Sequence, residues 1–272
     1  MSGEGGASTM RLAFSTLGCP DWPIERVAEA AREYGYDGVE LRIFEGERLP
    51  PRLPDDQRRR LRTALRGLPV ACVDTSLQMA NLAPGWEDDL RGHVEQAADL
   101  GAPFVRVFGG SPPAGISDLV HHLQRPLLEA GTIATAAGVR VALETHDDLS
   151  AARVLGPVLD AVPAEAAVTA LWDLHHPYRM GESPEEVWRV LGKHIGLVHV
   201  KDARRDVAQR TGWQLVLLGD GEVPVHESLD LLQARGYGGW VSVEWEKAWH
   251  PEIEPPEIAL PQHAEVLRRW LR

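Results

Sequence analysis

The sequence has only two cysteines, Cys19 and Cys72, among 272 residues. Two thiols are too few for a disulfide framework, and these two lack the paired CxxC spacing of a thiolate metal site. We therefore expect a protein of the reducing cytoplasm whose fold depends on neither disulfide bonds nor cysteine-bound metal.

Long apolar runs are missing as well. No segment approaches the roughly 20 apolar residues that a membrane-spanning helix needs. The first residues, MSGEGGAST, have neither the basic region nor the apolar region of a signal peptide. We expect no membrane partner and interpret residues 1–10 as a flexible N-terminal tail.

Positive charge is scarce. The chain has 28 Lys and Arg residues against 40 Asp and Glu residues, which gives a formal net charge of −12. Such a charge repels phosphate backbones and anionic lipids, so we expect no nucleic-acid partner. A small neutral substrate, or one bound through a cation, fits this charge better.

No linker rich in proline, glycine or serine divides the chain, and short apolar runs alternate with amphipathic segments. Residues 24–43 show the pattern. Ile24, Val27 and Ala31 recur at helical spacing, and Gly35 then ends the expected helix before an apolar run begins. A helix, a glycine and an apolar strand in this order are typical of a repeated βα unit.

Eight such units occur in about 260 residues, which is the size of one closed barrel. A doubly wound open sheet would usually need fewer strands. We therefore predict an α/β protein with a single (β/α)₈ TIM barrel, the catalytic domain, over residues 11–272. The expected strands are residues 11–18, 38–43, 70–76, 104–110, 139–146, 168–176, 195–202 and 240–246.

Ionisable residues gather at the ends of the last four expected strands, the end at which such barrels place their active sites. Side chains two residues apart share one face of a strand, so three carboxylates and one imidazole can point toward the barrel axis. A single strand-end Glu or His is commonly an ordinary solvated residue, and the prediction rests on the four together. They are Glu144, Asp173, His199 and Glu244.

Three buried carboxylates repel one another and are costly to desolvate unless a cation neutralises them. A ligand set of oxygens with one nitrogen favours a hard or borderline divalent ion. We expect Mn²⁺ first, with Mg²⁺, Co²⁺, Fe²⁺ or Zn²⁺ as alternatives. Coordination positions would be left open for substrate oxygens.

At these residues the chain resembles the xylose-isomerase-like barrel superfamily, which includes sugar phosphate isomerases and epimerases, inosose dehydratases and isomerases, and ketose 3-epimerases. The resemblance runs from Arg11 to Arg272. It implies the same four metal ligands, with Glu144 and Glu244 also acting as the acid/base pair and His176 contacting the substrate. The motifs that carry it are GYDGVELR (35–42), VALETHDD (141–148), LWDLHHP (171–177), LVHVKDARRD (197–206), LLGDGEVP (217–224) and VSVEWEK (241–247).

The same superfamily contains endonucleases that act at abasic sites in DNA, and their multi-zinc site needs further histidines. Here the corresponding positions read VDTS, VFGG and LLGDGEVP, without those histidines. In ketohexose 3-epimerases the metal histidine is followed by a glutamate and an arginine at set spacing. This chain has HVKD instead, closer to the inosose-type enzymes.

The resemblance implies a divalent-metal-dependent isomerase or epimerase of a small keto sugar or cyclitol that works through an enediolate. The alternative is a metal-dependent lyase, a dehydratase or a β-elimination that includes keto-glycoside cleavage, which needs a second acid for the leaving group. Candidates for that acid are His146, His176 and Lys201, although His146 could simply bond to Asp147 or Asp148. A noncatalytic sugar-binding barrel is the second alternative.

Several further residues are expected near the substrate. Lys201 and Glu246 lie two residues beyond a proposed ligand on the same strand face. Glu40 and Arg106 either form an ion pair across the barrel interior or contact the substrate; the sequence leaves both open. We place four tryptophans in loops after strands, where their rings could pack on a sugar or an aglycone: Trp22, Trp86, Trp213 and Trp249.

The segment 203–224 is longer than usual connections between elements, so we interpret it as a lid or a subunit-contact loop. A homo-oligomer is compatible with the second of these roles. The sequence motif GDGEVP within the segment gives no role for Asp220 or Glu222.

Overall fold

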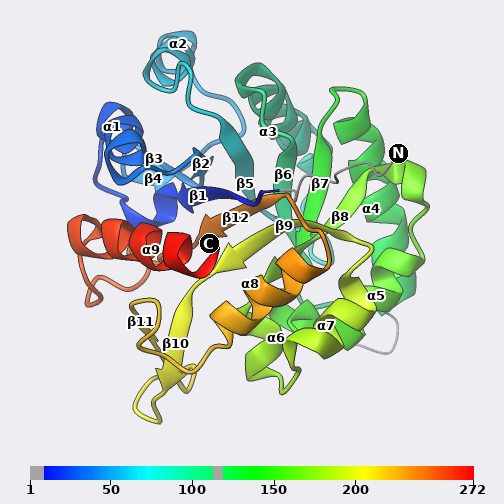
Figure 1. Ribbon diagram of the computed structural model, residues 1–272. Coiled ribbons are helices and arrows are strands. Elements are labelled where there is room, and N and C mark those ends of the chain that lie inside the picture. The colour runs from blue at the N-terminus through cyan, green and yellow to red at the C-terminus, as the bar shows by residue number, and fades with distance from the viewer. Residues whose placement is uncertain (1–8, 113–118) are drawn as a thin grey trace, which may run out of the picture.

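The computed structural model describes residues 9–112 and 119–272. Eight parallel strands close into a barrel in the order β1-β12-β9-β8-β7-β6-β5-β2, and β2 pairs with β1 (Figure 1). The predicted (β/α)₈ barrel is therefore confirmed. The strands are β1 (Arg11–Ser15), β2 (Gly38–Leu41), β5 (Val70–Gln78), β6 (Phe104–Phe108), β7 (Arg140–Glu144), β8 (Val168–Asp173), β9 (Ile195–Val200) and β12 (Trp240–Val243).

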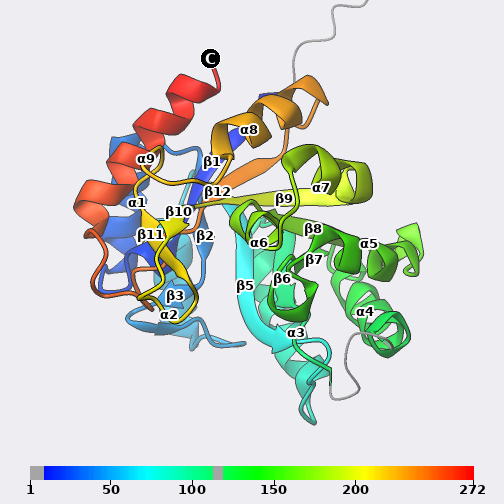
Figure 2. The same ribbon diagram turned by 90° about the horizontal axis from the view of Figure 1, so that it is seen from below.

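Helices surround the strands, from α1 and α9 on one side to α4 and α5 on the other (Figure 2). The helix predicted after residue 24 buries Ile24, Val27 and Ala31 and ends at Gly35, whose φ of 73° suits glycine. The helices are α1 (Ile24–Tyr34), α2 (Asp55–Ala64), α3 (Trp86–Leu100), α4 (Leu119–Thr135), α5 (Ala152–Asp160), α6 (His175–Arg179), α7 (Pro184–Leu191), α8 (Val225–Ala234) and α9 (Pro256–Trp270).

The tail predicted at residues 1–10 lies mostly outside the described residues, and its last residue, Met10, is buried against the barrel. Across residues 9–112 and 119–272, no helix combines the length and the apolar character needed to cross a membrane.

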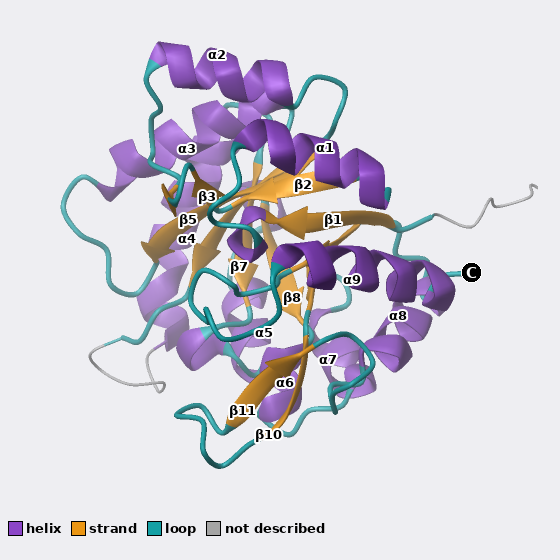
Figure 3. Ribbon diagram, turned by 90° about the vertical axis from the view of Figure 1, so that its left-hand side faces the viewer, coloured by secondary structure: helices purple, strands orange, loops and turns teal. Residues whose placement is uncertain are grey.

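Two antiparallel hairpins are added to the barrel. One pairs β3 (Ile43–Phe44) with β4 (Glu47–Arg48). The other pairs β10 (Asp202–Arg205) with β11 (Trp213–Val216), and Figures 1 and 3 draw it as a projection beyond the barrel strands. The segment 203–224, which the sequence suggested was a loop, is therefore largely a hairpin.

The barrel interior has an apolar floor below the strand ends. Ala142, Leu171 and Leu197 belong to a small buried cluster separate from the main core between strands and helices. Each lies two residues before an ionisable strand-end residue and so shares its inward face. The same inward face thus changes from apolar to charged along three neighbouring strands, which places the charged groups at the carboxyl end.

Acidification is expected to destabilise the fold through His263 on α9. Its imidazole is fully buried against Trp245, and burial lowers the pKa of His263 from 6.5 to about 4. The unfolded chain keeps the higher pKa, so it binds more protons than the folded chain between pH 6.5 and pH 4. Stability therefore falls as the pH drops through this window, by about 3 kcal/mol at about 1.4 kcal/mol per pKa unit.

Urea unfolding between pH 7 and pH 4 measures this effect. We expect His263→Met to reduce the slope of unfolding free energy against pH, because residue 263 then no longer titrates. The reduction is at most the contribution of one proton, about 1.4 kcal/mol per pH unit. His226→Gln, at a histidine whose side chain is 54% exposed, is the matched control and should keep the wild-type slope. A wild-type slope in His263→Met would contradict the assignment.

Candidate metal centre

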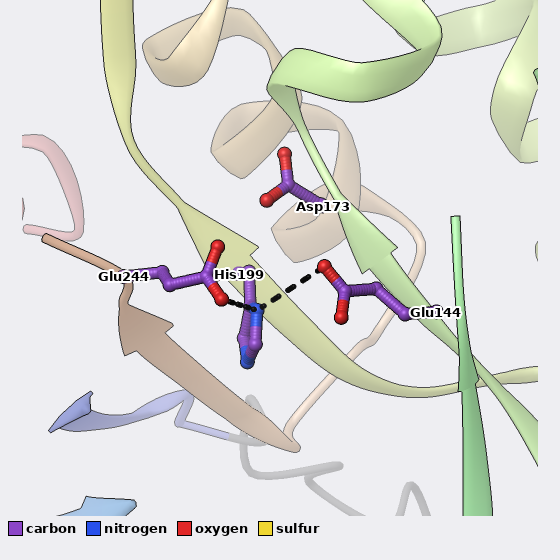
Figure 4. A group of neighbouring side chains, drawn as sticks. All are labelled: Glu144, Asp173, His199 and Glu244. Carbon is purple, nitrogen blue, oxygen red and sulfur yellow. Dashed lines mark ion pairs between the residues drawn. The ribbon is translucent and has the colours of Figure 1, made fainter. Parts of the chain in front are cut away.

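Four ionisable side chains from neighbouring strands converge at the carboxyl end of the barrel. Glu144 and Asp173 end β7 and β8, His199 lies in β9, and Glu244 follows β12. Each offers one ligand atom, and these atoms lie within 4.8 Å of one another (Figure 4). Glu244 is 6% exposed and the other three are fully buried. We call this set the ligand cluster.

Several polar atoms of the ligand cluster have no hydrogen-bond partner. They are both carboxylate oxygens of Glu144 and Nδ1 of His199. His199 Nδ1 lies 3.5 Å from Glu244 Oε1 and 4.0 Å from Glu144 Oε1. Buried polar atoms without partners are costly, and three carboxylates with one imidazole nitrogen match the donors that a divalent cation takes. The residues therefore fit such an ion.

Burial and neighbouring charges act on the carboxyls of the ligand cluster in opposite directions. Burial, with the nearby Glu244 charge, raises the pKa of Glu144, and burial also raises the pKa of Asp173. Burial opposes ionisation of Glu244 too, but Lys201 and His199 hold the pKa of Glu244 well below its usual value. The cluster thus combines carboxyls that differ strongly in proton affinity.

Glu40 orients His199 from below. Its Oε2 lies 2.9 Å from His199 Nε2, and both side chains are fully buried. Nε2–H donates to this carboxylate, which leaves Nδ1 facing the ligand cluster. Burial would lower the pKa of His199, but Glu40 and Glu244 hold it well above its usual value, so an ion that binds at Nδ1 would displace a proton.

The ion pair considered between Glu40 and Arg106 is not formed. Arg106 lies between Asp74 and Glu144 instead, with N–O distances of 3.3 and 3.5 Å. The reason is strand order: β5 separates β2 from β6, and Asp74 on β5 is in register with Arg106. Both Glu40 and Arg106 are enclosed in the barrel interior, as are three of the four ligand residues.

Lys201 lies between the ligand cluster and Glu246. Its Nζ lies 2.9 Å from Asp173 Oδ2 and 2.5 Å from both Glu244 Oε2 and Glu246 Oε1. Burial alone would lower the pKa of Lys201, but these carboxylates hold it well above its usual value. The ammonium group is therefore a fixed positive charge at the edge of the cluster.

A cavity of about 680 Å³ lies next to residues that contact the ligand cluster or Lys201, although none of the four ligand residues lines it. Glu246 and His176 line it, and the backbone N–H of His176 donates to Asp173 Oδ1 over 3.3 Å. His176 Nδ1 is 2.6 Å from the carbonyl oxygen of Thr145, so it donates there and leaves Nε2 as an acceptor. Burial lowers the pKa of His176 well below its usual value, which keeps this ring neutral.

His146 stands on the cavity wall beside His176. Its Nδ1 lies 2.9 Å from Asp147 Oδ1, and the two imidazole centroids are 4.9 Å apart. Burial would lower the pKa of His146, but Asp147 and Glu144 raise it above its usual value. His146 thus pairs with Asp147, which was the simpler of the two interpretations of the sequence, and its side chain also lines the cavity.

The four tryptophans placed in loops divide into two groups. Trp213 on β11 and Trp249 after β12 line the cavity. Trp22 donates its indole N–H to Glu257 Oε1 over 3.1 Å. The loop prediction is wrong for Trp86, which begins α3 and is only 8% exposed, because that helix starts earlier than the sequence pattern indicated.

The structure gives the GDGEVP motif a role that the sequence did not reveal. The carboxylate of Asp202 accepts hydrogen bonds from the backbone N–H groups of Ala203, Gly219, Gly221 and Val223, at 2.9 to 3.1 Å. A Cβ at residue 221 would lie 2.0 Å from Asp202 Oδ1, so only glycine fits there. This anchor ties residues 219–223, which follow the hairpin, to the first residue of β10.

Comparison with known proteins places the chain among similar barrels. A family model described as xylose isomerase-like TIM barrel matches residues 28–270. The structure of 3-keto-D-glucoside 4-epimerase, YcjR, from E. coli has a TM-score of 0.73 and 16% identity, covering 97% of this chain and 99% of that chain. A search of curated proteins finds no match.

Two further solved structures are similar. The IOLI protein with a binding zinc atom has a TM-score of 0.80 and 19% identity, with coverage of 96% of this chain and 98% of that chain. A probable 3-DHS dehydratase, AsbF, from Bacillus anthracis has a TM-score of 0.72 and 17% identity, with coverage of 95% and 99%. At these identities the likeness shows the shared fold.

Proposed function

Because the chain belongs to the xylose isomerase-like TIM barrel family, we propose that it is a divalent-metal-dependent isomerase or epimerase of a small keto sugar or cyclitol. The observation that carries this proposal is the convergence of four buried ligand atoms near a cavity, with the Glu144 carboxylate and His199 Nδ1 lacking hydrogen-bond partners. Similar structures include an epimerase of a keto sugar derivative and a protein that binds zinc.

The residues that would hold the ion are Glu144, Asp173, His199 and Glu244, with Glu40 fixing the orientation of His199. Mn²⁺ is the ion that we propose first. A bound divalent ion supplies Lewis-acid polarisation of a substrate carbonyl group.

The proton transfers are assigned to the two glutamates of the ligand cluster. Glu144 and Glu244 lie on opposite sides of His199 in Figure 4. One carboxylate removes a proton from the carbon next to the substrate carbonyl, and the other carboxyl returns a proton. Return to the opposite face of the same carbon gives epimerisation, whereas return to the neighbouring carbon gives isomerisation.

Residues of the cavity wall bind and orient the substrate in this proposal. His176 accepts a hydrogen bond from a substrate hydroxyl through Nε2, because its Nδ1 donates to Thr145. Glu246 accepts from a second hydroxyl, since its side chain lines the cavity and is 21% exposed. Lys201 keeps both Glu244 and Glu246 in place with two of its three N–H groups, and the third, which lies at Asp173, becomes free for a substrate oxygen if an ion takes Asp173.

A lyase is the second candidate, and the position of His146 favours it. A dehydration or another β-elimination, including keto-glycoside cleavage, needs an acid that delivers a proton to the leaving group. His146 is oriented by Asp147, faces the cavity and lies beside His176. The similar structures include a probable dehydratase as well as an epimerase.

Solvent-deuterium exchange tests the proposed function. The protein is incubated in D₂O with a panel of keto sugars and inososes, with Mn²⁺ or with a chelator. Deuterium in a recovered isomer supports the isomerase or epimerase, and loss of water or an aglycone supports the lyase. Absence of any exchange under both conditions would contradict both and favour a noncatalytic barrel.

A further inference from the structure

The cavity beside the ligand cluster is several times larger than a monosaccharide. Its volume is about 680 Å³. A hexose takes up the volume of about six water molecules, or roughly 180 Å³ at about 30 Å³ per water. One keto sugar or cyclitol therefore fills only a part of the cavity. The remaining volume holds either water or a further group of the substrate.

The lining of the cavity mixes polar and apolar side chains. His176 and Glu246 lie at the end next to the ligand cluster, since the His176 backbone donates to Asp173 and Glu246 pairs with Lys201. The β10–β11 hairpin, the residue after it and the loop after β12 contribute polar side chains, such as Arg204, Gln214 and Glu252, together with aromatic and aliphatic ones. The large apolar side chains among them are Trp213, Leu215, Leu217, Trp249 and Ile253, which we call the outer wall.

The two tryptophans of the outer wall differ in how firmly they are held. Trp213 is packed edge-on by His175 and Tyr178, with ring centroids 5.2 and 5.8 Å away. The Asp202 anchor fixes the segment that follows its strand. Trp249 is 43% exposed, although a large apolar side chain usually gains by burial. Arg205 lies over the Trp213 ring and Arg48 over the Trp249 ring, with guanidinium carbons 5.3 and 5.1 Å from the ring centres. One face of each indole is thus left onto which a flat ring can pack.

We propose that the outer wall is a second-ring subsite, which takes a ring joined to the keto sugar through a glycosidic bond. The inference rests on the proposed function, because the sugar must first lie at the ligand cluster. The shared chemistry of the bound group is a flat face of low polarity, which an aromatic aglycone and a second sugar ring both present. The substrate is then a glycoside rather than a free monosaccharide.

Binding measurements test the subsite directly. Calorimetric titration with Mn²⁺ present compares methyl β-glucoside, phenyl β-glucoside and cellobiose, which share the first ring and lack the reactive carbonyl. We expect phenyl β-glucoside or cellobiose to bind at least about tenfold more tightly than methyl β-glucoside, which corresponds to about 1.4 kcal/mol from ring packing. The phenyl and glucosyl ligands distinguish an aromatic from a sugar subsite.

Variants of the outer wall make the test specific. Trp213→Ala should remove the preference and change the affinity for methyl β-glucoside less than about twofold, whereas Trp213→Phe keeps a flat ring and should retain most of it. Trp249→Ala, at a more exposed position, repeats the test if Trp213→Ala folds poorly. Trp270→Ala is the control, because that tryptophan stacks on His226 on another part of the surface.

Equal affinities of the wild-type protein for all three glucosides would overturn the subsite. An equal loss of affinity for all three ligands in both Trp213→Ala and Trp249→Ala would overturn it as well. Because binding is read without turnover, the two proposals can fail separately. A ring preference without deuterium exchange would leave the subsite standing and remove the isomerase. Exchange into a free keto sugar without a ring preference would leave the isomerase standing and remove the subsite.

Discussion

Asp173→Asn is expected to lower the affinity for Mn²⁺ by at least about 100-fold and to remove turnover at low metal concentration. Loss of a group that merely supports a metal ligand commonly costs 10- to 100-fold, so loss of a charged ligand should cost at least the upper value. Asparagine is chosen because Asp173 Oδ1 also accepts the backbone N–H groups of His175 and His176, at 2.8 and 3.3 Å. The amide oxygen can keep these bonds while the negative charge is lost.

Equilibrium dialysis followed by metal analysis measures this affinity without a substrate. Asp160→Asn is the matched control: it also removes one carboxylate, but at a half-exposed position beside Lys193 and His194. It should bind Mn²⁺ as the wild-type protein does. Wild-type metal content in Asp173→Asn, with the fold intact by circular dichroism, would refute the proposed centre.

The barrel and the convergence of the ligand cluster could be predicted from local patterns. Apolar runs followed by helical spacing fix the eight strands, and the period of two along a strand fixes which side chains point inward. Glu144 and Asp173 each end a strand of such a barrel, so their side chains meet at one rim. No knowledge of side-chain packing is needed for this step.

The partners of the buried charges could not be predicted in the same way. They depend on which strands are neighbours and on register: Asp74 lies beside Arg106 because β5 is next to β6. Glu40 reaches His199 across the barrel, 159 residues away in the chain. The Asp202 anchor depends on the path of a returning loop, which periodicity does not describe.

Arg106→Met is expected to destabilise the folded protein by about 3–5 kcal/mol, the usual cost of leaving a buried charge without its partner. Arg106 is 1% exposed and lies within 3.5 Å of the carboxylates of Asp74 and Glu144. Its guanidinium carbon also lies 3.9 Å from the centre of the Phe108 ring. Methionine fills similar space and contacts the same ring, so the loss reports mainly on charge.

Chemical unfolding of a double-mutant cycle isolates that charge effect. Asp74→Asn neutralises one of the two carboxylates, so Arg106→Met should cost less in this background than in the wild-type background. The exposed pair Arg52 and Asp88 gives the control cycle, in which coupling of less than about 1 kcal/mol is expected. Equal costs of Arg106→Met in both backgrounds would show that packing, and not charge, explains the loss.

The same cycle connects the interior charges to the proposed metal centre. In Arg106→Met, Glu144 has lost a cation on one side, and a divalent ion in the ligand cluster would neutralise it from the other. Mn²⁺ should therefore stabilise Arg106→Met more than it stabilises the wild-type protein, because a ligand that binds only the folded state adds stability that grows with the logarithm of its affinity. In Arg106→Met/Asp173→Asn this gain should disappear. Equal stabilisation of the wild-type and Arg106→Met proteins by Mn²⁺ would mean that the ion and Arg106 do not act on the same carboxylate.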